Sequence, residues 1–112
     1  MAKLEISLHG DYDAWLKRIQ DGILNGSATA SLEDWSDFRS DDGTTRCSVL
    51  VFERYSMAGG NRLSLTATLF QDQSGVIACS AITAGGSNGR FFKVNTWGEE
   101  SFLDCFRDIV EH

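Results

Sequence analysis

The sequence predicts an α+β fold, in which an antiparallel sheet of five or six strands carries two helices on one of its faces. Three observations lead to this prediction: apolar and polar residues alternate in several short segments, two other segments repeat apolar residues at helical spacing, and short turn sequences join most strands. The expected order is strand, helix, five strands, helix, with neighbouring strands antiparallel. With 112 residues, the chain is expected to form a single domain, residues 1–112.

A change of period marks the first two elements. Leu4, Ile6 and Leu8 alternate with charged and polar residues, which predicts a strand with one buried face. Asp11 is a suitable N-cap for a helix over about residues 12–24. The apolar stripe of this helix consists of Tyr12, Trp15, Leu16, Ile19, Ile23 and Leu24.

The middle of the chain reads as a run of strands. Residues 28–39 alternate weakly and predict an edge strand with Leu32 and Phe38 on one face and Trp35 on the other. The next strand is expected to be central, because it carries apolar side chains on both faces. The strands after the edge strand cover about residues 45–55, 63–69 and 76–83, and turns are expected at 41–44, 59–61 and 71–75.

The segment AGGSNG, residues 84–89, is interpreted as a hairpin turn, with a binding loop that uses Arg90 as the alternative. A phosphate cradle needs a helix directly after its glycines, whereas residues 90–97 predict a last strand. A helix of about twelve residues is expected from Glu99 onward. Glu99 and Glu100 would lie in its first turn, where the helix dipole favours acidic groups.

Composition excludes several classes of function. The 16 acidic and 10 basic residues give a net charge of −6, which disfavours binding to nucleic acid and to anionic membranes. No apolar run is long enough for a membrane span or a signal peptide. The three cysteines show no metal-ligand spacing, so we expect reduced thiols in a cytoplasmic protein, with no metal and no cofactor. The two histidines, His9 and His112, lie in no catalytic motif, and no catalytic residue is predicted.

Arg54, Tyr55, Arg62 and Arg90 are the candidate ligand-binding residues. Arginines beside aromatic side chains can bind a carboxylate or a phosphate with two hydrogen bonds. A second candidate is a whole sheet face. Two helices can cover only one face, so we expect part of the other to be covered by a second copy of the chain.

The segments KLEISLHGDYDAWL, GNRLSLTATLF, SAITAGGSNGRFF and NTWGEESFLDCFRDIVE resemble a family of small bacterial proteins that is catalogued as a domain of unknown function. The resemblance covers most of the chain. It implies a bacterial, cytosolic protein and transfers no catalytic residue. The element order is also loosely similar to the helix-grip fold, in which a curved antiparallel sheet wraps a long C-terminal helix.

The function expected from the sequence is a non-enzymatic binding or interaction module that forms a homodimer. The alternative is a small-ligand-binding protein or a modest enzyme, with a pocket between sheet and helices that recognises an anionic group. The substrate and any protein partner are not specified by the sequence.

Overall fold

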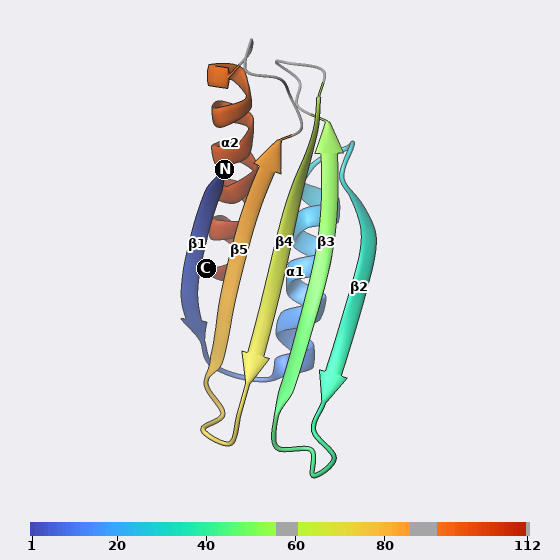
Figure 1. The fold of residues 1–112 in the computed structure, drawn as a ribbon, viewed down its shortest axis with the longest axis vertical. Coiled ribbons are helices and arrows are strands. Elements are labelled where there is room, and N and C mark those ends of the chain that lie inside the picture. The colour runs from blue at the N-terminus through green and yellow to red at the C-terminus, as the bar shows by residue number, and fades with distance from the viewer. Residues whose placement is uncertain (56–60, 86–91, 112) are drawn as a thin grey trace.

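The structure of the protein is a computed structural model that describes residues 1–55, 61–85 and 92–111, with residues 92–97 described by their backbone alone. Its elements follow the order strand, helix, four strands, helix (Figure 1). Their bounds are β1 Ala2–Leu8, α1 Tyr12–Gly26, β2 Ser31–Arg39, β3 Arg46–Tyr55, β4 Arg62–Gln71, β5 Ile77–Gly85 and α2 Phe92–Val110. The α+β class is confirmed, with five strands in the described part of the chain.

The strands form one antiparallel sheet in the order β1-β5-β4-β3-β2. Strands β2 to β5 pair in sequence as a meander, and β1 pairs with β5 at the far edge. β2 therefore lies at an edge and β3 between two partners, as their sequence patterns predict. The Asp-Gly turn before β3 is also confirmed, because Gly43 has a φ of 74°, a conformation that glycine adopts without steric cost.

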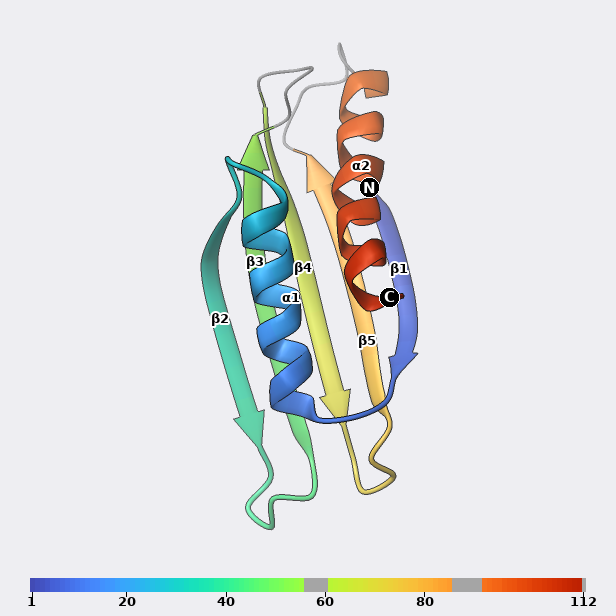
Figure 2. The ribbon, with the colours of Figure 1, turned by 180° about the vertical axis from the view of Figure 1, so that it is seen from behind.

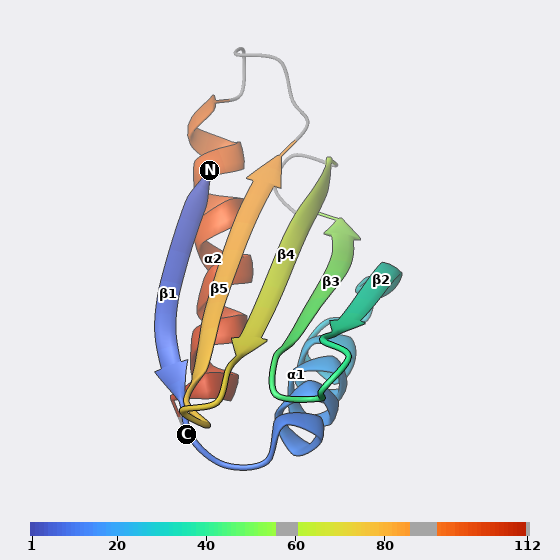
Figure 3. The same cartoon turned by 60° about the horizontal axis from the view of Figure 1, so that its bottom comes forward.

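Both helices pack on the same face of the sheet (Figures 2 and 3). Alternate residues of the strands point toward the helices, and in β4 these are Leu63, Leu65, Ala67 and Leu69, all buried. α1 contributes Ile19 and Ile23 to the core, and α2 contributes Phe102 and Phe106. α1 begins after Asp11, whose Oδ2 accepts a hydrogen bond from the Ala14 amide at 2.8 Å, so the predicted N-cap is confirmed.

The prediction for the last third of the chain is wrong in one respect. Residues 92–97 are the first turns of α2, so the expected strand over residues 90–97 is absent from its described part. Aromatic and β-branched residues lower helix stability by only a few tenths of a kcal/mol each, which a helix anchored by buried side chains overcomes. The helix has 19 residues, and Glu99 lies well inside it, buried against the Met1 ammonium group.

This correction also changes the interpretation of residues 84–89. β5 ends at Gly85 and the next element is the helix that begins at Phe92, so the segment does not join two strands. The interpretation of the segment as a hairpin turn is therefore wrong, because the element that follows it is a helix and not a strand. Residues 86–91, including Arg90, lie outside the described part of the chain.

Candidate functional site

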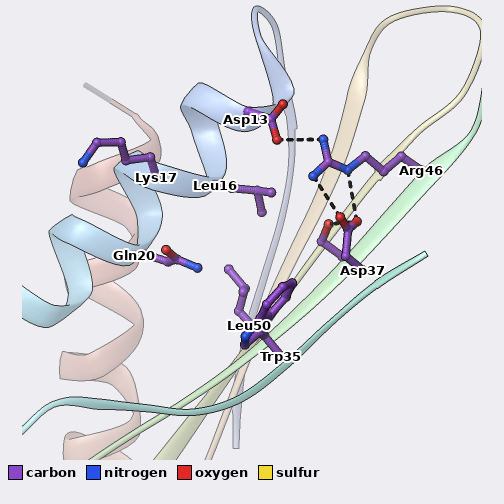
Figure 4. Close-up of a pocket in the computed structure, with 9 residues that line it drawn as sticks. Asp13, Leu16, Lys17, Gln20, Trp35, Asp37, Arg46 and Leu50 are labelled. Carbon is purple, nitrogen blue, oxygen red and sulfur yellow. Dashed lines mark hydrogen bonds and ion pairs between the residues drawn. The ribbon is translucent and has the colours of Figure 1, made fainter. Parts of the chain in front are cut away.

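A groove of about 300 Å³ lies between α1 and the β2 edge of the sheet (Figure 4). Leu16 from α1 and Trp35 and Leu50 from β2 and β3 line it with apolar surface. The Trp35 side chain is 60% exposed although it lies on the helix-covered side of the sheet. An indole left in water on the wall of a groove is a typical contact surface for a ligand.

Trp35 reaches the groove because β2 contains a bulge. Leu32 pairs with Phe52 and Trp35 pairs with Leu50, and the register shifts between Leu32 and Asp34. Phe52 and Leu50 both point toward the helices, so Leu32 and Trp35 do as well. Regular alternation predicted them on opposite faces, and that prediction is wrong because the bulge adds one residue to β2.

Arg46 closes one end of the groove and is held by carboxylates from two other elements. Its Nε and Nη2 donate to Oδ1 and Oδ2 of Asp37, both at 3.0 Å, and its Nη1 donates to Asp13 Oδ1 at 2.8 Å (Figure 4). The guanidinium also lies 4.3 Å from the centroid of the Tyr12 ring. Hydrogen bonds from Arg46 lower the pKa of Asp37, and this effect outweighs the burial that would raise it.

Tyr12 forms hydrogen bonds at the same end of the groove. Its hydroxyl oxygen lies 2.8 Å from Ser48 Oγ and 2.9 Å from the Leu69 carbonyl oxygen, while Ser48 donates to Asp37 Oδ1 at 2.8 Å. The Ser48 hydrogen is thus committed to Asp37, and the single phenol hydrogen serves two acceptors. Burial raises the pKa of Tyr12, so its hydroxyl stays a donor at neutral pH. The polar end of the groove is therefore a connected, preorganised network.

Lys17 and Gln20 project from α1 and complete the lining. Lys17 Nζ lies 2.6 Å from Asp21 Oδ2, one helical turn further on. Both cationic side chains of the groove, Lys17 and Arg46, therefore have a carboxylate partner within hydrogen-bond distance. An incoming anion would therefore find both of these cations already neutralised by carboxylates.

The structure brings two of the predicted ligand residues together, Tyr55 and Arg62, and places Arg54 on the opposite face of the sheet. Arg54 lies on the helix side of the sheet, with its Cζ 4.4 Å from the centroid of the Phe102 ring. Arg62 lies on the other face, 5.8 Å from the centroid of the Tyr55 ring. Arg90 lies outside the described residues. Ligand binding by these residues stays a prediction.

Arg62 borders a second hollow, of about 270 Å³, near the end of the β3–β4 hairpin. Its Nη2 lies 2.5 Å from Glu53 Oε1 and 3.7 Å from Glu33 Oε2. Two carboxylates therefore neutralise the guanidinium that an anion would need.

Sequence reasoning did not name Asp13, Trp35, Asp37 or Arg46 as site residues. A signal was present for Asp37 and Arg46, because they flank the predicted turn at 41–44 at distances that place them near each other in a hairpin. Asp13 gave no such signal. It comes from α1, 33 positions before Arg46, and only the tertiary packing brings the two together.

The sheet face opposite the helices, which we name the open face, is uncovered by any described element (Figures 1 and 3). The strand register aligns one row across it, from β2 to β5, which we name the aromatic row: Phe38, Cys47, Phe70 and Ala78. Phe38 is 64% exposed and Phe70 41%. The centre of the face consists of half-buried, uncharged side chains, namely Val49, Val51, Thr66 and Thr68.

Other chemistry has little support in the described residues. Among them, no three His, Cys, Asp or Glu side chains gather where a metal ion could bind. Neither described helix has the length and apolar character that a membrane crossing requires. Burial raises the pKa of the Cys79 thiol to about 12, which makes it a poor nucleophile.

The fold and these two surfaces define an α+β protein with an open antiparallel sheet, two helices on one face and a groove at one edge. The chain belongs to a family described as a family of unknown function, DUF6054, whose model matches residues 1–112. No curated protein matches the chain. No solved structure matches it either, so the loose likeness to the helix-grip fold stays a prediction.

Proposed function

We propose that the chain is a non-enzymatic interaction module that forms a homodimer through the open face. The observation that carries this proposal is the aromatic row, which leaves two phenylalanine rings in solvent on a sheet face that neither helix covers. Contiguous apolar surface of this kind is typical of protein interfaces. Two sheets that pack face to face bury such rows between them at a separation of ~10 Å.

The distribution of charge supports a second copy as the partner. Each chain carries a net charge of −6, so two copies repel each other unless they meet through a neutral surface. On the open face, charged side chains lie toward the margins. Lys3 and Glu5 form an ion pair at 2.9 Å, and Arg62 pairs with Glu53 and, at 3.7 Å, with Glu33. Asp34, opposite Val51 on the edge strand, adds a negative charge, and the centre between these margins is uncharged.

The three cysteines are free thiols, which supports a reducing compartment such as the cytoplasm of a bacterial cell. The lack of a catalytic role is supported by the surroundings of Ser48, a buried hydroxyl that contacts a carboxylate. Ser48 donates to Asp37, but Asp37 is held by Arg46 and no histidine lies between them to act as a base.

The test is the mass in solution, measured by light scattering after size exclusion and by native mass spectrometry. At micromolar concentration the wild-type chain should have twice the 12.3 kDa mass of one chain. Phe70→Lys places a charge in the aromatic row and should raise the dimer dissociation constant about tenfold or more, which corresponds to ~1.4 kcal/mol.

Leu24→Lys is the matched control. Leu24 is 37% exposed, close to the 41% of Phe70, but it lies on α1, on the helix side of the molecule. It should leave the dimer unchanged. A monomeric wild-type chain, or equal weakening by both variants, would contradict dimerisation through the open face.

A further inference from the structure

The groove beside α1 lies on the opposite side of the sheet from the open face, and it is built for a different kind of ligand. Its apolar wall is the exposed indole of Trp35, with Leu16 on the facing side (Figure 4). Burying a flat hydrophobic group against Trp35 would remove apolar surface from water on both partners. At about 300 Å³ the groove is at the small end of ligand sites, which suits a ligand with a single ring.

The polar end of the groove favours a hydrogen-bond donor. Asp13 is 71% exposed and uses only Oδ1 to bind Arg46, so its second oxygen has no partner among the described residues. Arg46 uses three of its five N–H donors on Asp37 and Asp13, and these two carboxylates neutralise its charge. An incoming group therefore meets a carboxylate oxygen that can still accept and a guanidinium that is already neutralised.

The charged side chains around the groove balance one another, so the groups left exposed in it determine its preference. Asp13, Asp37 and Asp21 face Arg46 and Lys17, and Arg39, whose Nη2 lies 3.7 Å from Asp37 Oδ2, brings the surrounding charge to neutrality. A cation near the indole also gains from the negative face of the ring. The exposed oxygen of Asp13 and the face of the Trp35 ring thus favour a positive ligand over a negative one.

We infer that this groove binds a small organic cation, a protonated amine carried on a flat apolar body. The body stacks on Trp35 between α1 and β2, and the ammonium group donates to Asp13. This site does not depend on the proposed dimer, because its lining residues point to the helix side of the sheet and the aromatic row points to the other.

The test uses three probes that share one phenylethyl body: 2-phenylethylammonium, 2-phenylethanol and 3-phenylpropanoate. Each is titrated into ¹⁵N-labelled protein at pH 7, and amide shifts are followed over the whole chain. We expect the ammonium probe to bind about five- to tenfold more tightly than the alcohol or the carboxylate, with shifts concentrated in α1, β2 and β3. Added salt should reduce this preference, since Asp13 is exposed to solvent.

Substitutions at two exposed positions separate the contribution of stacking from that of the hydrogen bond to the carboxylate. Trp35→Ala should abolish binding of all three probes, because it removes the stacking surface. Asp13→Asn should leave the alcohol unchanged and reduce the ammonium to the affinity of the alcohol. Glu5→Gln is the control, since Glu5 is an exposed carboxylate on β1, at the other edge of the sheet.

Three outcomes would overturn the proposal. Tightest binding of the carboxylate would show that Lys17 or Arg46 is available to anions. Shifts that map to the open face would place the apolar site there. Equal binding of all probes to the wild type and to Trp35→Ala, or no binding at all, would show that the groove selects no cation.

Discussion

Arg46 connects three elements through its side chain alone. It belongs to β3, and its guanidinium binds Asp37 on the edge strand and Asp13 in the first turn of α1. The bidentate contact with Asp37 fixes the orientation of the guanidinium, which a lysine could not achieve with its single ammonium. The same contact determines how this region responds to acid.

Asp37 has a pKa below its ordinary value because Arg46, and then Ser48, donate hydrogen bonds to its ionised form. In the unfolded chain its pKa returns to about 3.9. A carboxyl group with a lowered folded-state pKa stabilises the fold above the unfolded-state value, and this contribution is lost as pH falls through the folded-state pKa. Asp37→Asn should therefore reduce the free energy of unfolding at pH 7, and the difference from wild type should shrink below about pH 4.

The measurement is urea unfolding of both proteins from pH 7 to pH 2. Some acid sensitivity should persist in the variant, because hydrogen bonds from Ser40 and Thr44 lower the pKa of Asp42 to about 2. A difference between the two proteins that stays constant down to pH 2 would show that Asp37 does not titrate as its contacts indicate.

At the scale of elements, α1 and α2 approach each other closely at Gly22. A Cβ atom built on Gly22 would lie 2.5 Å from Ile109 Cδ1 and 2.6 Å from its Cγ1. Alanine is the better helix former by ~1 kcal/mol, but here it would push the helices apart. We expect Gly22→Ala to lower the free energy of unfolding by about 1–3 kcal/mol, as overpacking does in other cores.

The double-mutant cycle with Ile109→Ala tests the cause. Once the Ile109 side chain is shortened, Gly22→Ala should become neutral or stabilising, because only the helix preference remains. If Gly22→Ala costs the same in both backgrounds, as judged by urea unfolding, the two side chains do not compete for this space.

Most elements could be predicted from local pattern, because their patterns agree with their surroundings. β1 and β4 alternate cleanly and α1 has a capping residue and an apolar stripe, so each segment indicates its own structure. The start of α2 could not be predicted, since its first residues are rich in strand formers and the helix is fixed by Phe102, Phe106 and Val110 further along. Local preference there opposes tertiary packing, and packing prevails.

The groove could be predicted only in part, for a similar reason. Trp35 was assigned to the wrong face because one bulged residue, Glu33, reverses every side chain after it. A bulge has no dependable signal in the local sequence. The contact between Asp13 and Arg46 depends on how α1 packs on the sheet, which the local sequence does not specify. The open face could be expected from element order alone, since two helices cannot cover both sides.

At the scale of the whole molecule, the net charge of −6 should make the two proposed interactions respond oppositely to salt. Salt screens the repulsion between like-charged chains, so the dimer dissociation constant should fall severalfold between about 0.05 and 0.5 M NaCl. Over the same range, the ammonium probe should bind the groove more weakly. Sedimentation velocity at several salt concentrations checks the first response, and a dissociation constant that rises with salt would indicate that attraction between charges holds the dimer.

The pairing of β1 with β5 has a consequence for how the chain reaches its fold. Ala2 and Thr83 lie side by side in the sheet but 81 positions apart in the sequence. β1 is therefore synthesised before β5, and the two strands can pair only after the whole segment between them has been made. Contacts this distant in sequence are slow to form, because a large loop must close before they gain any stability. The meander of β2 to β5 can assemble first, which leaves the docking of β1 as the late step that closes the sheet.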